Sequence, residues 1–115
     1  MKAKRDITVY LNDIIESADL IEKYIKDISE SEFYANFEKQ DAVLHRIQII
    51  GEAAKQVPEE YRLKWSHISW KEIAGMRDIL VHEYFGVTLG MIWKVVIDDI
   101  PVLKNQVFKL LKDYK

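Results

Sequence analysis

Residues 69–86 read SWKEIAGMRDILVHEYFG, and they contain the clearest helix start and stop signals in the chain. Ser69, followed three residues later by a glutamate, forms a capping-box pattern, in which each of the two side chains bonds a backbone N–H of the first turn. The glycine that closes the stretch is a residue type that commonly ends helices. The pattern predicts a helix from about Trp70 to Val81 or Tyr84.

Two longer helical patterns precede this stretch. Apolar residues recur every three or four positions from about Asp6 to Ile28 and again from about Asp41 to Val57, as in amphipathic helices. Gly51, inside the second pattern, costs about 1 kcal/mol against alanine in helix stability. A glycine kept there despite this cost usually permits another helix to approach closely. Residues 29–40 are less regular, and we expect a short helical turn whose aromatic side chains cover one end of the core: Phe33, Tyr34 and Phe37.

The remaining segments complete an all-α chain. Pro58 begins a short helix that should run to about Trp65, because proline is tolerated in a first turn. Thr88 can cap a last helix, which Pro101 should kink or divide near Asp99. We expect residues 1–115 to form one domain, an antiparallel four-helix bundle with short additional helices. The inner face of the last helix should consist of Leu89, Ile92, Trp93, Val96, Ile100, Leu103, Val107 and Leu110.

Composition limits the possible functions. The 115 residues carry a formal net charge of −2, which argues against a general electrostatic nucleic-acid binder, so an RNA contact would need a local basic cluster or a surface made by two chains. The absence of cysteine excludes disulfides and thiolate chemistry. No apolar run is long enough for a membrane span, and the N-terminus lacks a signal-peptide pattern, so we expect a cytoplasmic protein.

Arg77 is the unusual residue of the 69–86 stretch. On a helix surface an arginine usually meets an acid three or four positions away, but here those positions are all apolar. Its partner must therefore come from elsewhere, either a carboxylate on another helix, such as Glu52, or the phosphate of a ligand. The apolar neighbours are Ile73, Ala74, Leu80 and Val81.

His82 follows Arg77 by five residues, which is roughly 140° around an α-helix, so the two would not point at one spot. Either the helix is distorted near Val81 or the site is shared between two chains. Asp78, four residues before His82, can hold the imidazole and raise its pKa for acid–base work. Tyr84, seven residues after Arg77, lies on the same helical face as the arginine.

Each of these residues also has a structural interpretation: Arg77 as an ion pair within the bundle, His82 as a cation at a helix end, Tyr84 as a core aromatic. The remaining candidates favour such roles more strongly. We expect His45 and His67 to be surface and loop residues, and Trp65 and Trp70 to be packing residues. The C-terminal lysines should form a solvated face, although they could help to hold RNA: Lys104, Lys109, Lys112 and Lys115.

The order arginine, four residues, histidine, one residue, tyrosine resembles the signature of the HepT-like family within the HEPN superfamily. Residues 49–55 (IIGEAAK) resemble that family's second-helix motif, and residues 70–86 match its central block. Trp93 and residues 98–103 also fit, so the resemblance extends from about Tyr10 to Leu111.

The resemblance implies an all-α protein that dimerises with the motif at a cleft between subunits, and a metal-independent endoribonuclease that needs no cofactor. Arg77 would hold the scissile phosphate of an RNA substrate and His82 would transfer protons, with Asp78 and Glu52 in support. It further implies the toxin of a type VII-like toxin–antitoxin system, neutralised when a cognate minimal nucleotidyltransferase adds AMP to Tyr84.

Two other hypotheses stay open at the level of sequence. The chain could be a non-catalytic helical dimer that binds a nucleotidyltransferase partner or a nucleotide through the same motif. It could also be a plain dimeric scaffold, in which Arg77 forms a buried structural ion pair whose removal costs several kcal/mol.

Overall fold

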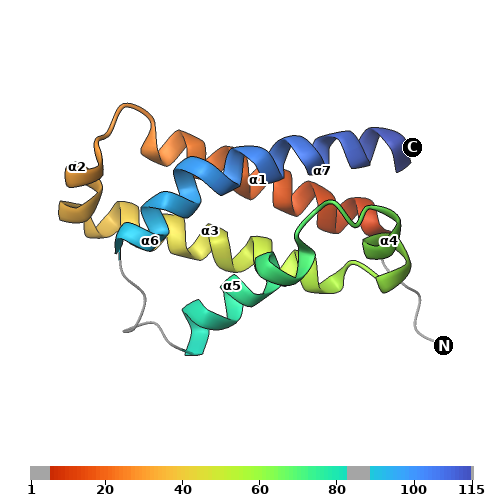
Figure 1. The fold of residues 1–115 in the computed structure, drawn as a ribbon. Helices are drawn as coiled ribbons and strands as arrows, with labels where there is room; N and C mark the ends of the chain where they lie inside the picture. The colour runs from red at the N-terminus through yellow and green to blue at the C-terminus, as the bar shows by residue number, and fades with distance from the viewer. Residues whose placement is uncertain (1–5, 83–88, 115) are drawn as a thin grey trace.

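The computed structural model describes residues 6–82 and 89–114, and for residues 78–82 it describes the backbone alone. Within that part of the chain every regular element is helical, which confirms the all-α prediction (Figure 1). The elements are α1 (Ile7–Ile25), α2 (Glu30–Ala35), α3 (Phe37–Gln56), α4 (Glu59–Lys64), α5 (Trp70–His82), α6 (Leu89–Lys94), a π-helical segment (Val95–Asp99) and α7 (Ile100–Tyr114).

The four long helices, α1, α3, α5 and α7, form the predicted antiparallel bundle. Helix α1 packs against both α3 and α7, and α3 packs on its other side against α5. Figure 1 shows α1 running opposite to α3 and α7, while α5 leaves the bundle obliquely. Among the described residues, none of the helices combines the length and the apolar character that a membrane span requires.

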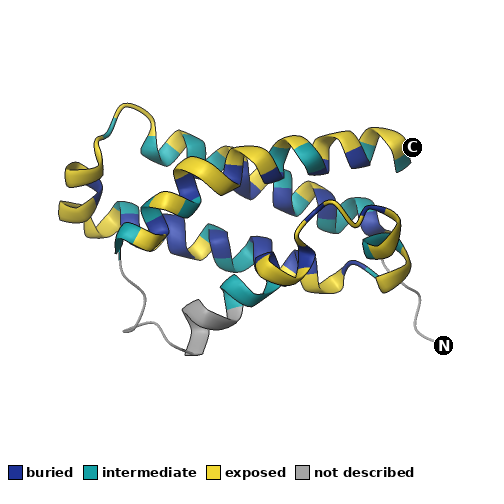
Figure 2. Cartoon of the chain, in the orientation of Figure 1, coloured by how far each residue is buried: buried dark blue, intermediate teal, exposed yellow. Residues whose placement is uncertain are grey.

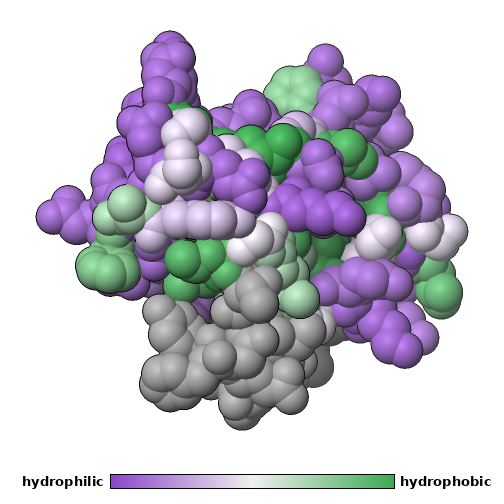
Figure 3. Space-filling view, turned by 60° about the vertical axis from the view of Figure 1, so that its left-hand side comes forward, coloured by the Kyte–Doolittle hydropathy of each residue, from purple (hydrophilic) through white to green (hydrophobic). Residues whose placement is uncertain are grey.

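The core lies where the apolar stripes of these helices meet (Figure 2). The N-terminal stripe is almost completely enclosed, and the inner positions predicted for the last helix are buried or partly buried. Outside the core, the face shown in Figure 3 carries mostly hydrophilic side chains around separate apolar patches. The residues buried on α1 include Ile7, Leu11, Ile14, Ala18 and Ile21.

Helix α1 starts as predicted and ends slightly early. The Asp6 carboxylate accepts a hydrogen bond from the Thr8 N–H at 2.8 Å, which caps the first turn. The helix stops at Ile25, three residues before the predicted Ile28. Asp27 has a φ of 63°, in the left-handed region that an α-helix cannot continue through, so the chain turns here.

The connection between α1 and α3 is more ordered than the sequence suggested. Ser29 and Glu32 form a capping box with bonds of 3.1 and 3.0 Å, which begins α2 and lowers the pKa of the Glu32 carboxyl. Helix α3 then starts at Phe37 rather than near Asp41, because Asn36 caps it by accepting from the Lys39 N–H at 3.0 Å.

The aromatic residues of this connection behave differently from one another. Phe33 is fully buried, as predicted, but Tyr34 and Phe37 are exposed, so for these two the prediction was wrong. A helix as short as α2 turns only one side toward the core, and Phe33 occupies that side. The buried Gln40 donates from Nε2 to the Phe33 and Tyr34 carbonyls, both at 3.0 Å, and so fastens α2 to α3.

Pro101 does not divide the last helix. The chain stays helical from Leu89 to Tyr114, but residues 95–99, just before the proline, widen into a π-helical turn in which the Ile100 N–H donates to the Val95 carbonyl. A proline ring crowds the carbonyl four residues earlier and has no N–H to offer it. A wider turn accommodates both effects without a break in the helix.

Candidate functional site

A close contact between α3 and α5 positions the candidate site. Gly51 lies directly under α5, where a Cβ added to it would come within 3.1 Å of the Arg77 Cγ and 3.2 Å of the Ile73 carbonyl oxygen. Any larger residue would force the helices apart, so the prediction that Gly51 permits close helix approach is confirmed. The contact brings the first side-chain carbons of Arg77 and the Ile73 carbonyl against α3.

Arg77 forms an ion pair with the residue next to this glycine. Its Nε contacts Oε1 of Glu52, which confirms Glu52 as the partner on another helix. The two side chains are 25% and 47% exposed, so the pair is accessible from solvent and is not a buried structural ion pair. An arginine held in this way keeps its planar cation near a surface that an anionic ligand can reach.

The ion pair borders an open pocket of about 330 Å³ between α1, α3 and α5. Most of the lining comes from one face of α3, whose residues recur at helical spacing, and α1 and α5 close two sides. The lining is mixed in chemistry, with carboxylate, amide, imidazole, phenol and guanidinium groups around two apolar side chains. The residues are Tyr10, Asp13, His45, Gln48, Ile49, Glu52, Ala53, Gln56 and Arg77.

Several of these residues were not recognised from sequence. His45 is exposed, as predicted, but it shares a pocket with Arg77 and is therefore more than an isolated surface histidine. Its spacing to Gln48 and Glu52, three and seven residues, placed all three on one face of α3 and was the available signal. Tyr10 and Asp13 gave no comparable signal, because they join the pocket from another helix.

The other motif residues are described less fully. Asp78 and His82 lie in the last part of α5, where the backbone alone is described, and Tyr84, Gly86 and Thr88 lie outside the described residues. Helix α5 continues as an α-helix from Trp70 through Val81 to His82. Positions 77 and 82 therefore fall on different faces of the helix, roughly 140° apart.

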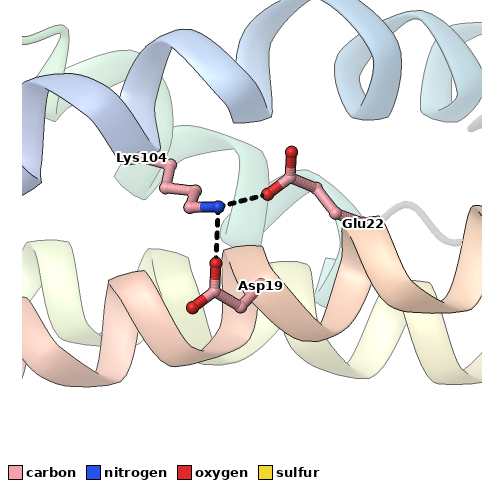
Figure 4. Close-up of polar contacts among 3 residues, drawn as sticks. All are labelled: Asp19, Glu22 and Lys104. Atoms are coloured by element: carbon pink, nitrogen blue, oxygen red, sulfur yellow. Dashed lines mark hydrogen bonds and ion pairs between the residues drawn. The ribbon is translucent and has the colours of Figure 1, made fainter.

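A second charged cluster links α1 and α7. The Lys104 ammonium contacts carboxylate oxygens of Asp19 at 2.6 Å and Glu22 at 2.7 Å (Figure 4). Hydrogen bonds to Asp19 and then Glu22 raise the pKa of Lys104. The prediction that Lys104 belongs to a solvated lysine face was wrong for this residue, because α1 supplies it with two partners.

Two tryptophans that sequence assigned to packing do pack. Trp65 and Trp70 are buried, and the Trp70 indole N–H donates to the Trp65 carbonyl at 3.1 Å. This bond closes the turn that precedes α5 and so helps to set where α5 begins. Among residues 6–77 and 89–114, whose side chains the structure describes, histidine and carboxylate groups form no cluster of three or more that could hold a metal ion.

Comparisons with known proteins identify a family and several similar sequences. The sequence model of a family described as "Ribonuclease HepT-like" matches residues 14–110. The chain is 42% identical over 95% of its length to a protein of Thermococcus cleftensis named "Probable ribonuclease HepT", of which the match covers 99%. No solved structure matches the chain.

A longer protein also matches. A Methanocaldococcus jannaschii protein named "Gamma-glutamylcyclotransferase and putative RNase" is 52% identical over 96% of the chain. The chain spans about half, 50%, of the length of that relative.

Proposed function

Because the chain belongs to the HepT-like ribonuclease family, we propose that it is a metal-independent endoribonuclease whose site contains Arg77 and His82. The observation that carries the proposal is the placement of Arg77. Its guanidinium is held by Glu52 at the rim of an open pocket, where it is partly exposed and within reach of a phosphate.

In the proposed reaction the ribose 2′-oxygen attacks phosphorus and the bond to the 5′-oxygen breaks. The 2′-hydroxyl loses a proton, the leaving 5′-oxygen gains one, and the products carry a 2′,3′-cyclic phosphate and a 5′-hydroxyl. Arg77 stabilises the negative charge that develops on the phosphoryl oxygens. His82 transfers a proton, with Asp78 four residues before it available to orient the imidazole. Glu52 orients Arg77.

The geometry of α5 favours a site shared between two copies of the chain. Positions 77 and 82 lie roughly 140° apart around this α-helix, so we do not expect a single copy to bring them together. Two α5 segments that face each other would place the arginine of one chain near the histidine of its partner. We therefore propose a homodimer with the active site in the cleft between subunits.

We further propose that the chain is the toxin of a toxin–antitoxin pair. A minimal nucleotidyltransferase would transfer AMP from ATP to the Tyr84 hydroxyl and release pyrophosphate. The bulky anionic adduct, on a residue seven positions after Arg77 in the sequence, would exclude RNA and compete for the arginine. Intact mass after co-expression with a nucleotidyltransferase encoded beside it should show additions of whole AMP units at Tyr84, and an unchanged mass would contradict this regulation.

The central test is cleavage of single-stranded RNA by the purified chain in the presence of EDTA. We expect products ending in cyclic phosphate, and we expect His82→Ala to lower the rate by about 10²–10⁴-fold, the usual contribution of a positioned acid–base group. His67→Ala, in an exposed loop residue, is the matched control and should keep the wild-type rate. A folded, dimeric wild type that leaves several RNAs intact would overturn the activity. A stable complex with the nucleotidyltransferase would then favour the non-catalytic binding role.

A further inference from the structure

The pocket beside Arg77 is longer than a phosphate-binding site requires. It follows α3 from Gln56 back to His45, eleven residues or about 16.5 Å along the helix at 1.5 Å per residue. A single phosphate held by Arg77 beside Glu52 would fill only part of this length and leave the remainder for another part of the ligand. Its volume of about 330 Å³ is at the lower end of the range for small-molecule sites, about 300–1,000 Å³.

The charge of the lining decides what can occupy the remainder of the pocket. Asp13 and Glu52 contribute two negative charges, and Arg77 contributes one positive charge that already faces Glu52. With His45 neutral, the lining has a formal charge of −1, so a second phosphate near Asp13 would be repelled. A neutral group with N–H donors would instead find carboxylate acceptors.

A nucleobase is such a group. Single-stranded RNA is usually recognised by stacking of bases on aromatic side chains and by hydrogen bonds to their Watson–Crick edges. The pocket offers Tyr10 and His45 as aromatic surfaces, Asp13 as an acceptor and the Gln48 amide as both donor and acceptor. Ile49 and Ala53 supply the apolar contact that a base plane also requires.

Resting on the proposed ribonuclease function, we propose that this pocket is a base-recognition subsite that receives the base next to the phosphate held by Arg77. Asp13 reads the base edge. Guanine is the base that fits best, because its N1–H and N2–H₂ groups are adjacent donors that one carboxylate can accept together. Uracil fits worst, because its single N–H lies between two carbonyl oxygens that a carboxylate repels.

Cleavage specificity tests the subsite directly. Single-stranded RNAs that differ at one position beside the cut should be cleaved fastest with guanine and slowest with uracil. Asp13→Asn should reduce that preference by about tenfold or more, since a good bidentate base contact discriminates by one to two orders of magnitude. Asp113→Asn, an exposed carboxylate at the end of α7, is the matched control and should keep the wild-type preference. An equal preference in wild type and Asp13→Asn would overturn the subsite while the nuclease activity stands.

Binding separates this proposal from the nuclease activity itself. Titration of the wild-type chain with 5′-GMP, 5′-UMP and inorganic phosphate, followed by NMR, should show the tightest binding for GMP. The GMP advantage should disappear in Asp13→Asn and weaken in Gln48→Ala and His45→Ala, with His67→Ala as the control for the last. Binding of this kind by a chain that cuts no RNA would support the subsite and reject the nuclease. Equal binding of GMP and phosphate would overturn the subsite whatever the chain does to RNA.

Discussion

Two cations of this bundle are held by carboxylates on a neighbouring helix, and they are held in different ways. Lys104 of α7 reaches two carboxylates of α1, Asp19 and Glu22, with a long and flexible side chain. Arg77 of α5 pairs with Glu52 because Gly51 lets the two helix backbones come close. The lysine cluster joins two helices that already pack along their length. The arginine pair sets a planar cation at the edge of a mixed pocket, and this difference is why we propose a functional role for Arg77 and a structural one for Lys104.

Removal of the arginine should have the largest effect. Arg77→Ala is expected to lower the rate of RNA cleavage by about 10²–10³-fold, the loss found when a donor to developing charge is removed. Its free energy of unfolding should fall by only about 0–1 kcal/mol, because the pair with Glu52 is partly exposed. Cleavage assays and urea denaturation on the same samples measure both quantities.

The scaffold hypothesis predicts the opposite balance for this variant. If Arg77 were chiefly structural, Arg77→Ala would unfold several kcal/mol more easily, and any functional loss would follow from instability. Lys104→Ala is the matched control, since it removes a cation from a comparable ion-pair cluster away from α5. It should cleave RNA at the wild-type rate.

The close helix contact should give the next largest effect. Gly51→Ala introduces a Cβ into space occupied by Arg77 and the Ile73 carbonyl, so we expect a loss of about 1–3 kcal/mol in unfolding free energy, typical of overpacking. Because the helices must separate, cleavage should fall as well, even at temperatures where the variant is folded.

Gly75→Ala is the control for this substitution. Gly75 lies on α5, the helix that packs against Gly51, but a Cβ added at Gly75 meets no atom within 4 Å. It should be neutral or slightly stabilising, because alanine favours the helix by up to about 1 kcal/mol. If Gly51→Ala were as stable as Gly75→Ala, helix propensity rather than packing at Gly51 would determine the result.

Glu52→Gln should act through Arg77 and have a smaller effect. The amide keeps the size of the side chain and removes its charge, so Arg77 loses its ion pair with Glu52 but stays in place along α5. We expect a roughly tenfold lower cleavage rate. In the double variant Glu52→Gln/Arg77→Ala, the loss should be smaller than the sum of the two single losses in free energy, because coupled residues are non-additive. Full additivity in the double variant would contradict the positioning role of Glu52.

The smallest effect should come from Lys104→Met. The lysine side chain is 37% exposed, so the cluster should contribute at most about 1 kcal/mol, and less in high salt. The two carboxylates raise the pKa of Lys104 above 10.5, so the cluster stabilises the fold at neutral pH. This contribution is complete below the unfolded-state pKa and is lost as pH rises through the higher folded-state pKa. Thermal denaturation from neutral to alkaline pH should therefore show the two proteins converging as the pH becomes strongly alkaline.

Much of the fold could be predicted from local sequence patterns. The apolar spacing located the four long helices, and the start of α5 at Trp70 followed from its capping pattern. Boundaries were less certain where an unnoticed cap intervened, as at Asn36, or where a single residue left helical space, as at Asp27. The disturbance of the last helix by Pro101 was predicted, but the structure accommodates the proline with a π-helical turn rather than a break.

Some features of the candidate site could likewise be predicted from the sequence, and others could not. The sequence by itself determined that Arg77 needs a partner outside its own helix and that Gly51 favours a close contact, because both statements depend on neighbours within two turns. It also determined that positions 77 and 82 face different ways on a regular helix.

Only the tertiary structure decided that the partner is Glu52, that His45 and Gln48 share a pocket with Tyr10 and Asp13 of α1, and that Lys104 binds α1. These contacts join side chains on different helices. They depend on how far each helix is shifted along its axis and rotated about it, and a local pattern fixes neither quantity. Packing of the whole core sets both, and the Gly51 contact is one place where sequence and packing meet.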